Sequence, residues 1–331
     1  MARRRVLFRC DNVGGVGFGH FVRCLNLARA VRSVDPRCEV AFRGAYDAFA
    51  TEALRRHALE WRDAAPIGQS GSDVADEMAE LSAFDIVVLD SYRLTQAGLD
   101  AAKGRGFRLA VFDDSQQYDL SGADLAICFR AGVENRATGA RRQALGIGYL
   151  VVPPELRGIR IRNLAAPPAG VRNILLFLGG GGIDDALLAR VVDAVSLPGV
   201  SVNYLTRDGR PVVDNRHAVA RAVRADMDGM YAAADLVVSG GGLLKYESAY
   251  CGIPNACLAL TPLQEEDTRA LAARDLTLDL GPMHLFDAAR VRNALSGLAS
   301  SPRALAAQRH AFALMLDTDS PRRLADAILS L

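Results

Sequence analysis

Paired cysteines are the feature that this sequence most clearly lacks. The 331 residues contain six scattered cysteines, with no Cys-x-x-Cys pair and no histidine at zinc-ligand spacing from two of them. The pattern argues against a disulfide-stapled domain or a structural zinc site. It predicts free thiols, buried or partly buried, in a protein that works in a reducing compartment.

An excess of charge of one sign and a long apolar run are also missing. Thirty-nine basic residues face 38 acidic ones, so no overall field favours nucleic acid or an acidic membrane surface. The apolar stretch after the arginines at 3–5 is interrupted at Arg9 and Asp11, which makes it too short for a signal peptide or a membrane span. We expect a cytoplasmic protein with neither a nucleic-acid partner nor a stable membrane association.

What the chain does contain is an alternation of apolar strand-like runs and amphipathic helical stretches, which is typical of α/β units with parallel sheets. Half of the residues are apolar, enough for two cores of ordinary size. The expected strands are 5–10, 39–43, 85–90, 108–113 and 124–128, and then 172–178, 200–205, 235–239 and 255–260. The expected helices are 21–33, 71–81, 95–103 and 184–196, one that starts near Leu243, and a helical C-terminal stretch at 302–331 interrupted at 319–321.

The segment 163–170 carries a Pro-Pro pair and is the best candidate for a linker. It predicts an N-terminal lobe at 1–162 and a C-terminal lobe at 171–331, with the option that the last helix crosses back to the N-terminal lobe. Each lobe is expected to be a doubly wound, Rossmann-like α/β domain. Ligands of such sheets bind beyond the carboxyl ends of the strands.

The first glycine-rich turn follows strand 5–10 and contains Gly17, Gly19 and His20. A helix start presents unpaired amides and a positive dipole end. This environment favours a neutral imidazole, which can act as a general base, and we expect the glycines to leave the ring exposed. The alternatives are a histidine that only bonds the backbone, or a dinucleotide-binding loop. The latter is weakly indicated, because Val22 stands where the third glycine of Gly-x-Gly-x-x-Gly would be.

The second glycine-rich turn follows strand 235–239. Its candidate substrate-binding residues are Gly240, Gly241, Gly242, Leu243, Leu244 and Glu247. The glycines would let a diphosphate approach the amides of a helix start. Glu247 lies one turn further on and could accept hydrogen bonds from a ribose diol, or it could be a solvated glutamate stabilised by the helix dipole.

Five further candidates lie where strands are expected to end. Gly180 and Gly181 belong to a four-glycine turn after strand 172–178, which is either a cleft lining or a flexible turn. Asp90 and Asp114 follow strands 85–90 and 108–113 and could orient His20 or bind substrate, although such residues often cap loops. Gln264 follows strand 255–260 and could contact phosphate or sugar.

Several of these residues together carry a resemblance to a known family. The segment Arg9-x-Asp11, Gly17-x-Gly19-His20-x-x-Arg23 resembles the opening of the UDP-sugar hydrolase of the pseudaminic acid pathway and its spore-coat-polysaccharide relatives. Asp90-Ser91-Tyr92 is similar to an Asp-His-Tyr segment of that family, and the region from Asp235 to Glu247 is similar to its nucleotide-binding region. The chain is also similar to the transferase that adds N-acetylglucosamine to lipid I.

The resemblance implies a GT-B fold, in which two Rossmann-like lobes face each other across a cleft. It further implies that His20 is the base, that Glu247 and the glycines hold uridine diphosphate, and that Tyr92 contacts substrate. This sequence departs from the family at Ser91, where the family has a histidine, and at Leu243 and Leu244, where hydroxyl side chains are lost.

The function that we predict is that of a glycosyltransferase that uses a UDP-sugar donor and a small soluble acceptor. Because the helix dipole and the turn amides would stabilise the leaving diphosphate, we expect the reaction to need no metal ion and no cofactor. The alternatives are a nucleotide-sugar hydrolase, in which water is the nucleophile, and a sugar-nucleotide binding module without catalysis.

Overall fold

The structure, a computed structural model, describes residues 3–13, 18–68, 73–179, 183–224 and 227–331. Its contacts divide the chain into two compact units. The first unit contains Met1–Val152 together with Thr318–Leu331, and the second contains Pro153–Asp317. The first unit is therefore assembled from two separate stretches of sequence.

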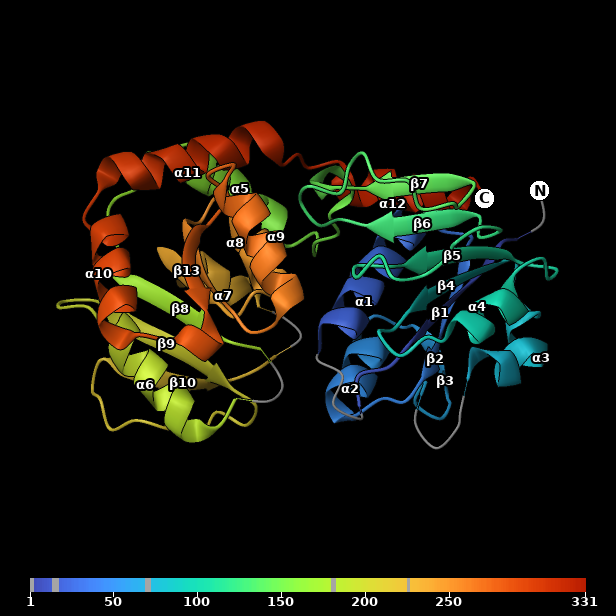
Figure 1. The fold of residues 1–331 in the computed structure, drawn as a ribbon, viewed down its shortest axis with the longest axis horizontal. Helices are drawn as coiled ribbons and strands as arrows, with labels where there is room; N and C mark the ends of the chain where they lie inside the picture. The colour runs from blue at the N-terminus through green and yellow to red at the C-terminus, as the bar shows by residue number, and fades with distance from the viewer. Residues whose placement is uncertain (1–2, 14–17, 69–72, 180–182, 225–226) are drawn as a thin grey trace. The chain divides into compact units, whose positions relative to one another are not determined.

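The first unit is built on a parallel sheet, in which its described residues form seven strands in the order β3-β2-β1-β4-β5-β6-β7 (Figure 1). The strands are β1 (Arg5–Cys10), β2 (Glu39–Gly44), β3 (Glu60–Asp63), β4 (Ile86–Asp90), β5 (Arg108–Phe112), β6 (Leu125–Cys128) and β7 (Arg142–Leu145). Cys10 pairs with Asp90, so β1 and β4 end side by side. The strand order reverses between these two strands, and in open α/β sheets such a reversal marks the place where ligands bind.

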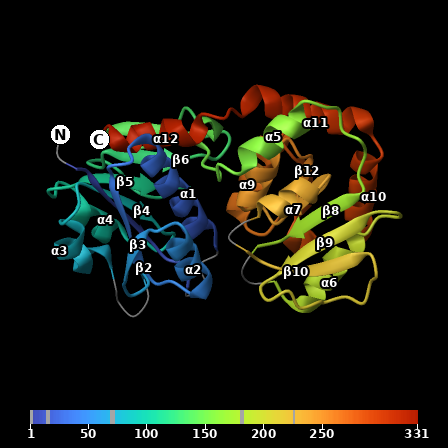
Figure 2. The same ribbon diagram turned by 180° about the vertical axis from the view of Figure 1, so that it is seen from behind.

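Helices cover both faces of this sheet. They are α1 (Phe18–Val34), α2 (Ala48–Arg56), α3 (Met78–Leu81), α4 (Gln96–Ala102) and α12 (Ser320–Leu329), with the single-turn 3-10 helices η1 (Val74–Glu77) and η2 (Ile147–Tyr149). On one face Leu7 and Val87 pack with Leu99 of α4. On the other face Phe8 stacks on Phe42, next to α1. Helix α12 packs against α1, so the end of the chain completes the first unit (Figures 1 and 2).

The second unit repeats this plan with a parallel sheet of six strands among its described residues, in the order β10-β9-β8-β11-β12-β13. The strands are β8 (Asn173–Phe177), β9 (Ser201–Thr206), β10 (Ala218–Ala222), β11 (Leu236–Ser239), β12 (Asn255–Ala259) and β13 (Leu278–Pro282). The order reverses between β8 and β11, where Phe177 pairs with Ser239. The two sheets therefore share one topology, with each reversal next to a glycine-rich segment.

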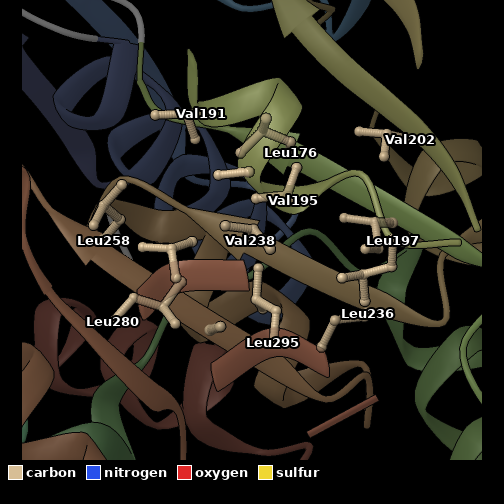
Figure 3. Packing of buried hydrophobic residues seen from close by; sticks show 14 of the residues in the cluster. Leu176, Val191, Val195, Leu197, Val202, Leu236, Val238, Leu258, Leu280 and Leu295 are labelled. Atoms are coloured by element: carbon tan, nitrogen blue, oxygen red, sulfur yellow. The ribbon is translucent and has the colours of Figure 1, made fainter. Parts of the chain in front are cut away.

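The second unit also has helices on both faces of its sheet. They are α5 (Leu156–Leu164), α6 (Asp185–Val195), α7 (Asp228–Ala233), α8 (Leu243–Tyr250), α9 (Pro262–Ala272), α10 (Ala288–Ala299) and α11 (Pro302–Met315), with the 3-10 turn η3 (Met283–Leu285). Figure 3 shows one face of the core, where Val191 and Val195 of α6 and Leu295 of α10 pack on Leu176 and Val238 of the sheet. Their burial, worth about 25 cal/mol per Å² of apolar surface, fixes the strand ends in place.

The doubly wound α/β plan expected for both lobes is confirmed. The chain passes between the units at Val152–Pro153 and again at Asp317–Thr318. The segment 163–170, expected as the linker, lies inside the second unit. There Arg309 Nη1 donates to the carbonyl oxygens of Asn163 at 3.0 Å and Ala166 at 2.8 Å, which ties this proline-rich stretch to α11. All six cysteines are buried free thiols.

Candidate active site

The first turn of α1 brings His20 and Arg23 to one side of a helix, because residues three apart are neighbours on a helix surface. The helix begins at Phe18, three residues before the expected start, so His20 is the third helical residue. Asp90 is the last residue of β4, and Asp114 lies two residues beyond the end of β5. The topology of the sheet therefore brings together one histidine, one arginine and two carboxylates that are far apart in sequence.

His20 and Asp90 form a close pair. His20 Nδ1 lies 2.5 Å from Asp90 Oδ1, and both side chains are buried. Arg23 and Cys24 donate to the same carboxylate, Arg23 through Nε and Nη2 at 2.5 Å each and Cys24 through Sγ at 3.4 Å. Two oxygen atoms thus accept four hydrogen bonds, which holds Asp90 in one orientation.

Asp90 is held in its ionised form. Burial alone would raise the pKa of its carboxyl, but the Arg23 guanidinium and His20 outweigh burial and hold the pKa well below its usual range. An ionised carboxylate can only accept hydrogen bonds, so Nδ1 of His20 carries the proton that faces it. With that proton on Nδ1, the neutral form of the imidazole has its lone pair on Nε2, and a general base needs such a lone pair.

Arg23 links the two carboxylates. Its Nη1 donates to Asp114 Oδ2 at 2.5 Å, while Nε and Nη2 bind Asp90. The guanidinium carbon lies 4.5 Å from the centre of the Phe112 ring and 5.6 Å from that of Phe129. A planar guanidinium suits this site because it can donate to two carboxylates and stack on aromatic rings at the same time.

Tyr92 covers His20 from the side. Its ring meets the imidazole edge-on, with 4.4 Å between ring centres, and its hydroxyl donates to Asp114 Oδ2 at 3.0 Å. Burial of the hydroxyl and the neighbouring Asp114 raise the pKa of Tyr92, although 52% of the residue is exposed. His20 itself is only 6% exposed, so the expectation of an exposed ring is wrong: the side chain lies under Tyr92 and against Asp90.

The structure describes only some of the glycines in the first turn and in the four-glycine turn. Gly17, Gly180 and Gly181 lie outside the described residues. Gly19 lies in the first turn of α1, where a Cβ would meet none of the described residues within 4 Å.

The second glycine turn leads into α8, with Gly242 as the N-cap residue. Gly240 is required by packing, since a Cβ there would lie 2.1 Å from the Leu178 carbonyl oxygen, and its amide donates to the Phe177 carbonyl at 3.0 Å. Gly241 has φ +88°, a conformation that favours glycine. Leu243 and Leu244 are the first two residues of α8, where amides have no partner within the helix.

Glu247 lies in the second turn of α8 and is buried, so the alternative of a solvated glutamate is wrong. Its Oε2 accepts a hydrogen bond from the Tyr231 hydroxyl at 2.5 Å. Burial raises the pKa of the Glu247 carboxyl, and the hydrogen bond from Tyr231 opposes that rise. Tyr231, itself 1% exposed, thereby fixes the direction of the Glu247 side chain.

Gln264 and Lys245 both lie against the second glycine turn, at Gly241. Gln264 Oε1 accepts from the Leu260 amide at 2.9 Å, and a Cβ on Gly241 would lie 2.9 Å from that of Gln264. Lys245 Nζ donates to the Gly241 carbonyl at 2.8 Å and pairs with Asp267 Oδ2 at 2.7 Å. The amide of Gln264 is therefore engaged on its oxygen side with the backbone at the end of β12.

Sequence reasoning assigned no role to Arg23, Tyr231, Lys245 or Asp267. The signal for Arg23 was available, since a basic residue three positions after a helix-start histidine shares its face, and two strand-end aspartates need a cation when buried. Arg9 and Asp11, quoted for the family resemblance, form a separate buried network. There Arg9 Nη1 donates to Asp11 Oδ1 at 2.7 Å and Nη2 to Glu77 at 2.9 Å.

Within the part of the chain that the structure describes, no group of three or more His, Cys, Asp and Glu side chains is arranged to hold a metal ion. In those same residues, no helix combines the length and the apolar character needed to cross a membrane.

Comparison with known proteins gives matches in structure but not in sequence. No family model and no curated protein sequence matches the chain. Among solved structures, the MurG of Acinetobacter baumannii has a TM-score of 0.68 at 15% identity, covering 99% of this chain and 100% of that one. The spinosyn forosaminyltransferase SpnP has a TM-score of 0.67 at 16% identity, with coverage of 99% and 100%. UGT89C1 of Arabidopsis thaliana, complexed with UDP, has a TM-score of 0.68 at 12% identity and 99% coverage of both chains. At these identities the likeness shows the fold, and the fold is GT-B.

Proposed function

We propose that this protein is a glycosyltransferase that moves a sugar from a UDP-sugar to a small soluble acceptor. The observation that carries the proposal is the His20–Asp90 pair, because an ionised Asp90 at 2.5 Å leaves His20 Nε2 ready to accept a proton. The structure of UGT89C1 complexed with UDP, which has the same fold, supports a nucleotide-sugar donor.

In the proposed reaction, an acceptor hydroxyl or amine attacks the anomeric carbon of the donor sugar. Its proton passes to His20 Nε2, while Asp90 stabilises the imidazolium that forms. The bond between the anomeric carbon and the diphosphate oxygen breaks, and UDP leaves with the electron pair. Arg23 and Asp114 hold Asp90 and Tyr92 in place around the histidine.

On the donor side, we propose that the start of α8 binds the leaving diphosphate. The amides of Gly241, Gly242, Leu243 and Leu244 are the proposed donors, whereas the Gly240 amide is already used by Phe177. A helix N-terminus stabilises such an anion without a metal ion. Glu247, oriented by Tyr231, is the proposed acceptor for the ribose hydroxyls, and Gln264 is proposed to contribute to the same donor site.

The test is turnover with a panel of UDP-sugars, each with and without candidate acceptors, measured as released UDP and as glycosylated product. We expect product only when donor and acceptor are both present, and we expect activity to survive EDTA. Release of UDP in water alone at the same rate would make the protein a hydrolase. Tight UDP-sugar binding without any release across the panel would make it a binding module and would refute the proposal.

A further inference from the structure

Lys245 is an unusual residue for its position. The chain carries only two lysines, Lys103 and Lys245, among 39 basic residues. Lys103 bonds Asp100 on the surface of the first unit, whereas Lys245 is 1% exposed and lies in the first turn of α8. A fully buried ammonium at this place in a helix needs a physical reason.

The helix dipole makes the position electrostatically unfavourable. The N-terminus of a helix carries a partial positive charge, so anions are stabilised there and cations are not. Burial of the ammonium adds a further desolvation cost. Asp267 of α9 compensates at 2.7 Å, and the Tyr246 hydroxyl donates to the other oxygen of that carboxylate at 2.6 Å. The ammonium group of Lys245 thus lies beneath the glycine turn, and the Asp267 carboxylate holds it there.

Lys245 also sets the direction of the turn's backbone. Its Nζ binds the carbonyl oxygen of Gly241 at 2.8 Å and so holds that oxygen toward the protein interior. In a trans peptide the carbonyl and the following N–H point in opposite directions, so the amide of Gly242 is directed away from Lys245. Gly242 is exposed, and among the described residues a Cβ there would meet nothing within 4 Å. The lysine therefore directs the Gly242 amide outward from the start of α8.

We propose that Lys245 is a positioning residue for the donor's diphosphate. It would fix the Gly241–Gly242 peptide with its amide toward the phosphates and add a buried positive charge behind them, without touching the ligand. The inference rests on the proposed function, since it concerns the diphosphate of a UDP-sugar. It fits the departure at Leu243 and Leu244, because a charge behind the turn would replace hydroxyl groups beside the phosphate.

The experiment compares D267N with K245M/D267N. Both variants lose the Asp267 charge, and only the second also loses the ammonium, so their difference isolates Lys245. The double variant replaces a buried ion pair by neutral groups, a change that proteins often tolerate. Thermal unfolding without ligand verifies that both variants fold. Binding of UDP, UMP and inorganic pyrophosphate is then measured by calorimetry at two salt concentrations.

We expect K245M/D267N to bind UDP and pyrophosphate about tenfold or more weakly than D267N, because the positive charge behind the phosphates and the bond that orients the Gly241–Gly242 peptide are both lost. The affinity for UMP, which lacks the β-phosphate, should change less. D267N should bind UDP at least as tightly as the wild type, since it leaves the ammonium less neutralised. Equal UDP affinity of the two folded variants, or an equal loss for UMP, would overturn the role of Lys245 alone. A wild-type protein that binds no UDP would overturn the proposed function as well.

Discussion

Each unit buries a basic residue in a helix that follows one of the two strands at its sheet reversal, and the two units use that residue differently. Arg23 follows β1 in the first unit and is surrounded by Asp90, Asp114 and the histidine that it helps to orient. Lys245 follows β11 in the second unit and binds one carboxylate and a backbone carbonyl. One cation binds the carboxylate that pairs with an imidazole, whereas the other binds a carbonyl oxygen of the glycine turn. In the proposed function, the first reversal therefore serves a proton acceptor and the second an anion.

The largest effect is expected from removing the proton acceptor. His20→Ala should lower kcat by about 10²–10⁴-fold, the usual contribution of a general base. Its UDP affinity should stay within about twofold of the wild type, because the proposed phosphate ligands lie in the second unit. Steady-state kinetics and calorimetry measure the two quantities. Parallel loss of kcat and UDP affinity would contradict the hypothesis that His20 acts in catalysis while the second unit binds UDP.

The next largest effect concerns stability. Arg23→Met leaves Asp90 and Asp114 buried without their main cation and should lower the free energy of unfolding by about 3–5 kcal/mol. Denaturant unfolding measures this loss. Arg9→Met is the matched control, since Arg9 is equally buried between Asp11 and Glu77. Both variants should be destabilised, but only Arg23→Met should retain a lowered kcat under conditions where both proteins are folded. A kcat that falls equally in both would argue that Arg23 is purely structural.

Replacing the proposed ribose acceptor should act on the donor. Glu247→Ala should raise KM for the UDP-sugar by about tenfold, with kcat changed less, because it removes a binding contact that ground state and transition state share. Initial rates across donor concentrations give both constants. Tyr231→Phe, which frees Glu247 Oε2 but keeps the carboxylate, should produce a smaller rise in KM. An unchanged KM in the alanine variant would exclude Glu247 from the donor site.

The smallest effect is a pH dependence of stability. Burial raises the folded-state pKa of Glu247, so the folded protein takes up a proton at higher pH than the unfolded chain does. The contribution of Glu247 to stability therefore increases as pH falls through the raised value and is complete near the unfolded pKa of about 4.3. The free energy of unfolding of the wild type, relative to Glu247→Gln, should rise over this window. A difference that stays constant with pH would contradict the raised pKa.

Nine of the thirteen strands in the described residues were predictable from sequence, and the four that were not are the edge strands of the two sheets. Central strands such as β4 and β11 are buried on both faces and appear as continuous apolar runs. The edge strands β3, β7, β10 and β13 are partly exposed and carry polar or small residues, so their sequences resemble loops. Their strand conformation depends on a neighbour that local sequence does not reveal.

The candidate site shows the same limit. His20 and the strand-end position of Asp90 follow from local patterns, because helix starts and strand ends can be read from a few residues. The bonds of Arg23 to Asp90 and Asp114 depend on strand order, which places β4 beside β1 and β5 on the far side of β4. Tyr231 and Glu247 likewise meet only because α7 and α8 are folded into one unit. Residues whose partners lie far along the chain escape local reasoning.

The helix α12 has a consequence for the order in which the molecule can be made. Its buried residues Leu324, Ala325 and Ile328 complete the unit that contains His20, yet they are synthesised after the whole of the second unit. The second unit is one continuous stretch of sequence, so it can fold co-translationally, before α12 has been synthesised. In the first unit, the part of α1 that packs against α12 stays uncovered until α12 has been synthesised. A fragment ending at Val152 would therefore lack a structural partner of the helix that carries the histidine.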